Sequence, residues 1–480
     1  MIKKGEIIKI TVQGYAFGGK GIGRIEDENK IIFVRNGIPG QVLLVKITKK
    51  KSSFYEAEII EIIKKSPLQI DHNYQAISGA PFIDLSIDEQ KKMKEKVCFE
   101  VFEKIGNLEN PKQYYDKWIS SPKTHHYRNK MEYSFSSIEY DLAIKKVIDN
   151  SFALGFKRKG TWWMVENLNK DSGLFDKELE DNLSKIRHFL QKTGLEAWHP
   201  PKKQGYFRHL VVRKSYYNNQ LLFNIVTSSK SHNNFKVDEF GIYLSKLLKE
   251  RFAGLIHTIN DDVADREKLD KGSSKLIVGQ SIIKEKINNL KFEISMQSFF
   301  QTNPKCAELL YSKVINYVEE STFKDDSCIL DLFCGTGTIT QLISSNINKK
   351  VIGVDIVKSA ITDAKANVKK NNFKNVEFIC ADVGKFLLEH PKYQNKIHTI
   401  VIDPPRAGIT PKSLRKVIRL NAKKIIYVSC NPSTQARDLA TLTEMGYKLE
   451  KFSLVDQFPH TAHIESIMLF SRSFVKTVHN

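Results

Sequence analysis

The chain has 480 residues, of which 41% are hydrophobic and 27% charged, so it is long enough for two or three soluble domains. No apolar stretch approaches the length of a membrane helix, and the N-terminus lacks the apolar region of a signal peptide, so we expect a cytoplasmic protein with no membrane partner. Lys and Arg total 75 against 54 Asp and Glu, and the resulting net charge of +21 favours nucleic acid as a partner, although a lysine-rich solvated surface explains it equally well.

Residues 1–66 form the first predicted domain. The stretch "EIIKITVQGYAFGGKGIGRI" alternates apolar and polar residues and then turns at several glycines, and further strands flank "RNGIPG" and precede Pro67. Short strands at regular spacing with glycine turns predict a small β-barrel. The lysines at 46 and 49–51 indicate either a phosphate-binding edge or a charged strand that resists aggregation.

Residues 67–295 are predicted to be a mixed α+β domain. "SIDEQKKMKEKVCFEVFEKIG" has helical periodicity, and three later stretches combine strand patterns with cations and aromatic rings. RNA recognition uses this mixture, although ordinary core aromatics in a mixed sheet would give the same pattern. The candidate RNA contacts are Arg128, Lys130, Lys157, Arg158, Lys159, Arg208 and Arg213, beside Tyr127, Phe156, Trp162 and Phe207.

Residues 296–480 alternate strands and helices, which predicts a doubly wound, Rossmann-like α/β domain. The last two strands, in "YKLEKFSLVDQF" and "HIESIMLFSR", have no helix between them and predict an antiparallel edge on a parallel sheet.

Polar groups follow successive strands of this domain. "LDLFCGTGT" is a glycine turn without the phosphate fingerprint, and Asp355, Asp382 and Asp403 stand at the ends of the next three strands. A carboxylate at the tip of the second strand can accept both ribose hydroxyls of a nucleoside. A single aspartate is more often a helix cap, but the set fits S-adenosylmethionine better than NAD because nothing in it serves a pyrophosphate.

Cys430 lies where the apolar strand of "IIYVSCNPST" meets the Asn431-Pro432 turn. Buried structural cysteines are common, but this one stands at the edge of the sheet where ligands bind. The six cysteines form no C-x-x-C pair, which argues against a zinc or disulfide framework.

Three motifs, "SFFQTN" (298–303), "IDPPRAGI" (402–409) and "YVSCNPST" with "DQFPHTAHIES" (456–466), resemble those of the RNA uracil-5-methyltransferase family. The "GYAFGGKGIGR" and "VRNGIPGQ" loops resemble the TRAM domain that accompanies RNA-modifying enzymes. The resemblance implies methyl transfer from S-adenosylmethionine to C5 of a uridine, in 23S ribosomal RNA by preference and in transfer RNA as the alternative. It also implies a TRAM-like barrel (1–66), a central RNA-binding domain (67–295) and a methyltransferase domain (296–480), and we expect a monomer.

Carried over by motif, the resemblance implies cofactor contacts and catalytic groups. The residues expected at the cofactor are Gln301, Phe333, Thr338, Asp355, Asp382 and Asp403. Cys430 matches the nucleophile that adds to C6 of a flipped-out uracil, and Glu465 matches the base that removes the C5 proton. Arg406, His460 and His463 are further candidates, for stabilising the enolate or a phosphate and for moving protons.

One departure from the family pattern and two rival functions complete the prediction. Some relatives hold an iron–sulfur cluster after the TRAM domain, but "HNYQAISGAPFIDLSIDEQ" contains no cysteine, so we expect no metal centre. RNA cytosine-5-methyltransferases place a cysteine after proline in a loop that here reads Asp403-Pro404-Pro405-Arg406. A non-catalytic RNA-binding protein is disfavoured because the nucleophile and the base are both present.

Overall fold

The computed structural model describes residues 2–16, 18–25, 28–230, 235–262, 273–298, 300–321, 323–324 and 326–472. The chain divides into two compact units. Unit 1 comprises residues 1–72, 81–124 and 309–480, and unit 2 comprises 73–80 and 125–308. In the described ranges, no helix is long and apolar enough to cross a membrane.

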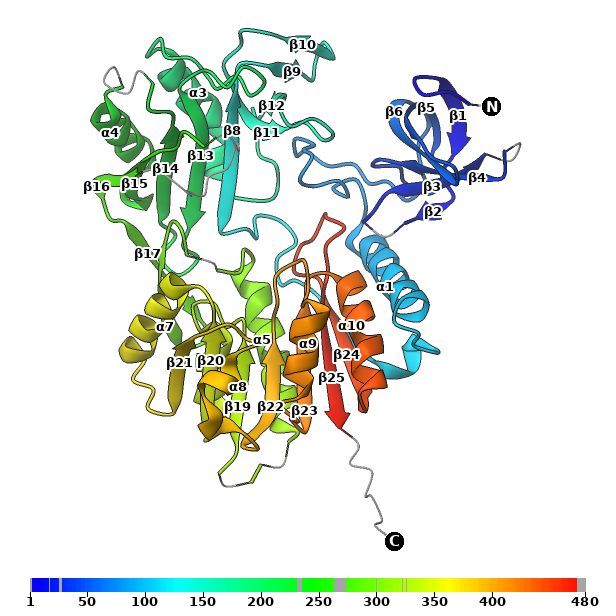
Figure 1. Ribbon diagram of the computed structural model, residues 1–480. Helices are drawn as coiled ribbons and strands as arrows, with labels where there is room; N and C mark the ends of the chain where they lie inside the picture. The colour runs from blue at the N-terminus through cyan, green and yellow to red at the C-terminus, as the bar shows by residue number, and fades with distance from the viewer. Residues whose placement is uncertain are drawn as a thin grey trace. The chain divides into compact units, whose positions relative to one another are not determined.

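The N-terminal part of unit 1 is a six-stranded sheet in the order β1-β5-β6-β4-β3-β2 (Figure 1). Its strands are β1 (Ile7–Thr11), β2 (Gly14–Tyr15), β3 (Gly21–Ile25), β4 (Lys30–Val34), β5 (Val42–Lys50) and β6 (Phe54–Lys64). Alternate residues of these strands point inward to one apolar cluster, which includes Ile32, Leu43 and Val45. The small β domain predicted for the N-terminus is therefore present.

The C-terminal part of unit 1 is an eight-stranded sheet in the order β21-β20-β19-β22-β23-β25-β24-β7 (Figure 1). Its strands are β7 (Tyr115–Ile119), β19 (Cys328–Leu332), β20 (Lys350–Asp355), β21 (Val376–Cys380), β22 (Ile397–Ile402), β23 (Lys424–Ser429), β24 (Tyr447–Val455) and β25 (Glu465–Arg472). Strands β19 to β23 are parallel, whereas β25 runs antiparallel to both β23 and β24, as the missing helix between the last two strands predicts.

Helices follow the strands of this sheet in alternation. They are α1 (Ile87–Lys104), α5 (Pro304–Glu319), α6 (Thr338–Asn346), α7 (Lys358–Lys370), α8 (Phe386–Glu389), α9 (Pro411–Ile418) and α10 (Pro432–Glu444), with 3₁₀ turns η2 (Pro111–Tyr114) and η5 (Pro391–Tyr393). Helix α1 was predicted from its periodicity, and its Cys98, Val101 and Phe102 enter the same apolar core as the strands. Residues 81–124, expected in the central domain, thus pack with the C-terminal sheet in unit 1.

Unit 2 is built on a nine-stranded sheet in the order β10-β9-β12-β11-β8-β13-β14-β15-β16, with a separate β17-β18 hairpin. The strands are β8 (Lys130–Ser136), β9 (Glu139–Asp141), β10 (Lys146–Ile148), β11 (Ala153–Lys157), β12 (Val165–Asn167), β13 (Phe207–Lys214), β14 (Leu221–Thr227), β15 (Phe252–Ile259), β16 (Ser273–Gly279), β17 (Ile282–Ile287) and β18 (Leu290–Ser295). The helices are α2 (Lys177–Asp181), α3 (Leu183–Gln191) and α4 (Val237–Leu248), with the 3₁₀ turn η4 (Lys249–Arg251).

Two of the arginines proposed for RNA contact are structural instead. Arg208 is fully buried and donates to the carbonyls of Asn260 and Asp262, at 2.5 and 3.0 Å, while its guanidinium lies 4.4 Å from the Trp198 ring centre. Arg213 is also buried and donates to the Met296 carbonyl at 3.1 Å. For these two side chains the alternative left open by the sequence, an ordinary core position in a mixed sheet, is the one found, because strand β13 points them into the interior.

The fold class predicted from the sequence is confirmed: a Rossmann-like α/β sheet, an N-terminal small β domain and a mixed α+β part. The domain limits at 66/67 and 295/296 stay a prediction. The two units are defined by compactness in space, which does not show which segments fold independently.

Candidate functional site

The connectivity of the eight-stranded sheet selects one edge for ligand binding. From β19 the chain builds outward through β20 and β21, and it then returns to the other side of β19 with β22 and β23. Strand order therefore reverses between β19 and β22. In open α/β sheets, ligands bind at the carboxyl ends of the strands at such a reversal.

The glycine turn after β19 is held open at this edge. The Gly335 N–H donates to Asp355 Oδ2 at 2.9 Å, and the other oxygen of that carboxylate accepts from the Val357 N–H at 2.8 Å. Gly335 has φ +54°, and a Cβ built on it would meet nothing within 4 Å. Phe333, directly after β19, also takes the left-handed conformation with φ +63°. The backbone here is accessible to a ligand.

The start of α6 explains the second glycine of the motif. Gly337 is the N-cap in the left-handed region, with φ +77°, and a Cβ there would lie 2.2 Å from Phe378 Cζ. Only glycine satisfies both conditions. Thr338 follows as the first residue of α6, and it is buried.

The remaining carboxylates lie at neighbouring strand ends. Asp355 ends β20 and is the register partner of Cys380, so Asp382 follows two residues beyond that pair. Asp403 directly follows β22, and its N–H lies 3.4 Å from the Leu332 carbonyl at the end of β19. The structure therefore brings the three predicted aspartates to one edge.

Asp331 is a further carboxylate at this edge that the sequence analysis did not identify. It is fully buried in β19, its Oδ2 accepts from the Thr340 hydroxyl at 2.5 Å, and its Oδ1 is buried with no hydrogen-bond partner among the described residues. Burial and the nearby Asp403 raise the pKa of Asp331 to about 7, against hydrogen bonds from Thr340. The signal in the sequence was a lone charge inside the apolar run "CILDLF".

These groups fit S-adenosylmethionine. The cofactor presents a sulfonium cation, an ammonium group, ribose hydroxyls and an adenine amino group, which call for negative charge and hydrogen-bond acceptors. The edge offers an open glycine backbone, the unpartnered oxygen of Asp331, and the carboxylates Asp355, Asp382 and Asp403. A pyrophosphate would call for N–H donors and cations instead.

Cys430 is fixed between a strand and a helix. It follows β23 and precedes Asn431, which caps α10 by accepting from the Ser433 N–H at 3.2 Å, with Pro432 at the first helical position. The Asn431 amide also donates to the Arg406 carbonyl at 3.1 Å and so ties this turn to the loop after β22. The half-buried thiol is thereby held at the same edge as Asp403.

Strand register places Glu465 beside Cys430. Ser429 of β23 pairs with Ser466 of β25, and because the strands are antiparallel, the residue after Ser429 lies next to the residue before Ser466. Glu465 is 3% exposed, so its carboxyl group faces the protein interior rather than bulk water. Thirty-five residues of sequence separate a thiol and a carboxyl that the fold brings together.

The electrostatics of the edge favour neutral forms. Burial and, second, Glu465 raise the pKa of Cys430 to about 11, although Arg406 acts to lower it. Burial raises the pKa of Asp403 to about 7. Burial, with Asp403 as the second cause, also raises the pKa of Glu465 well above its usual range, although Arg406 opposes this. The site is thus short of positive charge, and its acids hold their protons tightly.

The other candidates divide between the units. Gln301 belongs to unit 2, where its carbonyl accepts from the Asn129 amide at 3.0 Å, so its role at the cofactor stays a prediction. His460 is buried with φ +63°, and its imidazole Nδ1 is hydrogen-bonded to the side chain of Gln90 in α1. This bond favours a structural role for the imidazole over one in moving protons. Arg406 and His463 are exposed.

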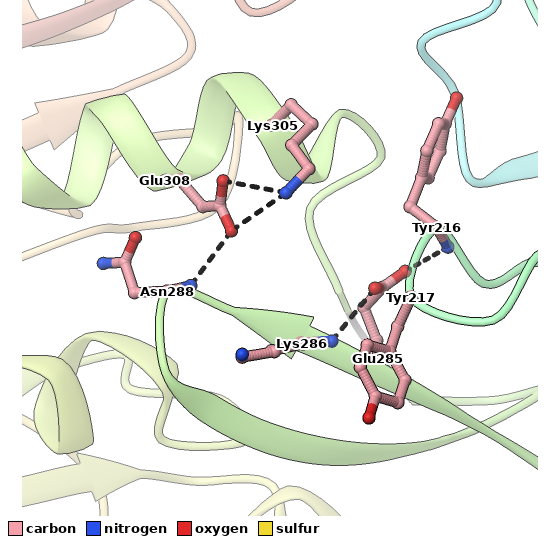
Figure 2. Close-up of a pocket in the computed structure, with 7 residues that line it drawn as sticks. All are labelled: Tyr216, Tyr217, Glu285, Lys286, Asn288, Lys305 and Glu308. Carbon is pink, nitrogen blue, oxygen red and sulfur yellow. Dashed lines mark hydrogen bonds and ion pairs between the residues drawn. The ribbon is translucent and has the colours of Figure 1, made fainter.

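A separate pocket lies in unit 2 and contains none of the candidate site residues (Figure 2). It has a volume of about 240 Å³, and its walls come from the β13–β14 turn, β17 with the turn after it, and the first residues of α5. Among its charged groups, Lys305 pairs with Glu308 at 3.2 Å, and Glu285 accepts from the Tyr216 backbone N–H at 2.7 Å. In the described part of the chain, no group of three or more His, Cys, Asp or Glu could hold a metal ion, and the expected lack of an iron–sulfur cluster stays a prediction.

Comparison with known proteins gives consistent matches. Residues 271–473 match the family model of tRNA (uracil-5-)-methyltransferases, and residues 3–60 match the TRAM domain. The chain is 36% identical to an uncharacterized RNA methyltransferase of Caldanaerobacter subterraneus, covering 98% of this chain and 100% of the relative. It is 33% identical to another from Clostridium tetani, covering 97% and 98%.

One solved structure matches over almost the whole chain. The crystal structure of the Pyrococcus abyssi tRNA (uracil-54, C5)-methyltransferase in complex with S-adenosyl-L-homocysteine aligns with a TM-score of 0.68 and 23% identity, over 96% of this chain and 100% of that one. At this identity the match supports the fold alone.

Proposed function

Because this chain belongs to the RNA uracil-5-methyltransferase family and is an S-adenosylmethionine-dependent RNA methyltransferase, we propose that it methylates a specific uridine of 23S rRNA through a covalent bond to Cys430. The observation that carries the mechanism is the register of β23 against β25, which sets the Cys430 thiol beside the Glu465 carboxyl.

The first step activates the base. The Cys430 sulfur, once deprotonated, adds to C6 of a uracil swung out of its stack, and the C5=C6 electrons move toward C5 and O4 as an enolate. S-adenosylmethionine, when bound, supplies the electrophilic methyl group for C5. The thiol is a suitable group because sulfur adds readily and also leaves readily.

The second step restores the ring. Glu465, as a carboxylate, removes the C5 proton, the electron pair of that bond re-forms the C5=C6 bond, and the Cys430 thiolate is expelled. The balance is a 5-methyluridine, S-adenosylhomocysteine left by the methyl donor, a recovered thiolate and a proton held on Glu465. The buried position of Glu465 suits this role, since a raised pKa makes its carboxylate a stronger base.

Deprotonation of Cys430 has to accompany RNA binding. With a pKa raised to about 11, the thiol of the free protein is neutral at pH 7. Arg406, which lowers that pKa, and the N-terminus of α10 both favour the thiolate. We propose that Arg406 keeps this role in the complex, and that Asp403 and the other edge carboxylates hold the cofactor and orient the uracil.

The chemical test uses RNA that contains 5-fluorouridine. Fluorine cannot leave as a cation, so methyl transfer should stop with Cys430 bound to C6, giving a denaturant-resistant adduct that mass spectrometry locates at residue 430. Cys430→Ala should give neither adduct nor turnover, while Cys380→Ala, which changes an exposed cysteine, should behave as the unaltered protein. Turnover of ordinary RNA without an adduct at Cys430 would overturn the mechanism.

The substrate test compares cellular RNA with and without the protein. We propose 23S rRNA on the family resemblance, and the name of the matching family model makes tRNA the second candidate. Loss of one 5-methyluridine in 23S rRNA on deletion would support the first. Loss in tRNA, or activity on cytidine in place of uridine, would replace it with the corresponding alternative.

The oligomeric state and the cellular location are also proposed from the family resemblance. We propose that the protein acts as a monomer in the cytoplasm, where the RNA substrates of the family are found. Sedimentation at micromolar concentration should give the mass of one 55.1 kDa chain.

A further inference from the structure

The segment from residue 456 to 464 leads directly into Glu465 and is buried despite its many polar groups. Asp456, Gln457 and His460 are each at most 1% exposed. His460 lies in the left-handed region with φ +63°, which a non-glycine residue adopts only when its surroundings impose it. Something outside the two flanking strands must therefore hold this segment in its conformation.

Gln90 of α1 makes the contacts that hold His460. Its Oε1 accepts from the backbone N–H of His460 at 2.7 Å, and its Nε2 lies 3.1 Å from the imidazole Nδ1. The same Nε2 donates to the carbonyl of Leu85 at 2.8 Å, and the Phe82 N–H donates to the His460 carbonyl at 3.0 Å. The backbone N–H of His460 is thus held by helix α1 and its carbonyl by Phe82 in the loop before that helix, both outside the motif regions.

Lys94, one helical turn further along α1, holds the start of the segment. Its ammonium group pairs with Asp456 at 2.6 Å and donates to the Phe458 carbonyl at 3.2 Å. Both side chains of the pair are almost completely buried, at 1% and 2% exposed. An isolated buried charge is costly, so each partner requires the other to stay in place.

The TRAM domain closes the far side of the same segment. An apolar cluster joins the TRAM residue Ile38 to Phe82, Leu85 and Met93. Tyr15 of the TRAM domain, Leu68 and Ala462 pack against it. A Cβ built on Gly19 would lie 2.4 Å from the Phe82 ring and 2.8 Å from the Ala462 Cβ. The turn therefore approaches Ala462 as closely as glycine allows.

We propose that Gln90, Lys94 and Gly19 are positioning residues that align Glu465 for removal of the C5 proton, so that α1 and the TRAM domain belong to the catalytic framework. This inference rests on the proposed function, because it assumes the role of Glu465. It predicts a selective defect: addition of Cys430 and methyl transfer proceed, whereas release of the methylated RNA slows.

The selective defect has a direct readout. When the C5 proton is removed slowly, a methylated RNA stays bound to Cys430, and a denaturant-resistant adduct builds up with ordinary uridine RNA. For Gln90→Leu and Lys94→Met, we expect turnover to fall at least tenfold, KM for RNA to stay within about threefold, and this adduct to accumulate. The controls are Gln113→Leu and Lys104→Met, the same substitutions at exposed positions nearby, which should show neither change.

Two outcomes would overturn the proposal: unchanged turnover in both variants, or reduced turnover without accumulated adduct. Lys94→Met leaves the Asp456 carboxylate buried alone and can unfold for that reason. The double variant Lys94→Met/Asp456→Leu removes both charges and keeps the test valid, since it should fold and still accumulate the adduct. A folded double variant with normal turnover contradicts the proposal.

The TRAM contact is tested by two alanine substitutions in one turn. Gly18 and Gly19 have similar positive φ angles, +81° and +77°, so alanine is equally strained at both. A Cβ at Gly18 meets nothing within 4 Å, whereas one at Gly19 presses on Phe82 and Ala462. We expect Gly19→Ala to accumulate adduct and lose turnover at least fivefold relative to Gly18→Ala. Equal behaviour of the two variants would exclude the TRAM turn from this role.

A reference variant separates this inference from the proposed function. Glu465→Gln should accumulate the methylated adduct on ordinary RNA. If neither it nor the 5-fluorouridine experiment yields an adduct, the covalent mechanism itself fails. If both yield adducts and the Gln90, Lys94 and Gly19 variants do not, only the positioning role fails.

Discussion

Two carboxylates, one in each unit, have opposite electrostatic surroundings. In unit 2, burial raises the pKa of Asp176, but hydrogen bonds and charges from Arg251 and Lys214, at 2.5 and 2.7 Å, outweigh it and lower the pKa overall. In unit 1, burial raises the pKa of Asp403 to about 7, with no opposing cation among its causes. Two cations thus neutralise the carboxylate in unit 2, whereas no cation opposes the effect of burial on Asp403.

The difference has a physical meaning for function. A paired carboxylate has its charge neutralised and its lone pairs occupied, so it stabilises the fold. It then offers a ligand little charge and few free acceptor sites. Burying an unpaired carboxylate costs free energy, and a cationic or hydrogen-bond-donating ligand recovers part of that cost when it binds. Asp331 and Asp403 therefore stand to gain from such a ligand, as our proposal that they face S-adenosylmethionine requires.

The largest stability effect is expected at the paired carboxylate. Asp176→Asn keeps the shape and the cap of α2 but leaves the half-buried Lys214 without its counter-charge and Arg251 with Glu178 alone, which should cost about 3–5 kcal/mol in the unfolding free energy of unit 2. The pKa of Asp176 is lowered in the folded state. The difference in unfolding free energy between the unaltered protein and the variant is therefore full above pH 4 and shrinks as pH falls below it. Hydrogen exchange of unit 2 peptides measures it. Unchanged protection would mean that the pair is not needed.

The corresponding change at the active site should affect activity instead. Asp403→Asn removes a carboxylate without leaving a cation unpaired, so we expect kcat/KM to fall roughly 10²–10³-fold, the range found when one preorganised polar contact is lost from an active site. Stability at pH 8 should hold or rise. An Asp403→Asn protein that unfolds at lower temperature than the unaltered one would show that this carboxylate is structural, and the contrast with Asp176 would fail.

The sequence predicts the strand ends of this site well and the contacts across them poorly. Asp355, Asp382, Asp403 and Cys430 were all found because each follows an apolar run, and parallel strands bring their carboxyl ends to one edge. The neighbourhood of Cys430 and Glu465 instead depends on the register of an antiparallel strand, which periodicity does not specify.

Buried polar residues were the main omission. Asp331, Gln90 and Lys94 occupy positions that an amphipathic pattern assigns to the apolar core or to the surface, and only their partners in distant segments explain them. Strand β7 was missed for a related reason, because it pairs with β24 across more than three hundred residues of chain. Arg208 and Arg213 show the converse error, since cations beside aromatic residues suggested RNA contacts for side chains that are buried.

A third prediction uses the pH dependence of stability. The pKa of Asp331 rises from 3.8 to about 7 in the folded protein, so the native state keeps a proton that the unfolded chain releases between about pH 4 and 7. Stability should therefore fall as pH rises through that window, by at most about 4 kcal/mol, and level off above it. Asp331→Asn should be more stable than the unaltered protein at pH 8, equal to it at pH 4, and weaker in cofactor binding. Equal stability at both pH values would contradict this account.

The smallest effect concerns the thiol that shares this cation-poor edge. Burial, followed by Glu465, raises the pKa of Cys430 to about 11, so its alkylation by iodoacetamide in the free protein should be slow at pH 8 and rise roughly tenfold per pH unit toward pH 11. Glu465→Gln removes the second cause and should speed alkylation at pH 9 by up to about tenfold. Exposed Cys380, read in the same digest, should be unaffected by Glu465→Gln and serves as the internal control. If Cys430 reacts as fast as Cys380 at pH 7, the edge is not short of positive charge, and the contrast with the paired carboxylate of unit 2 does not extend to the nucleophile.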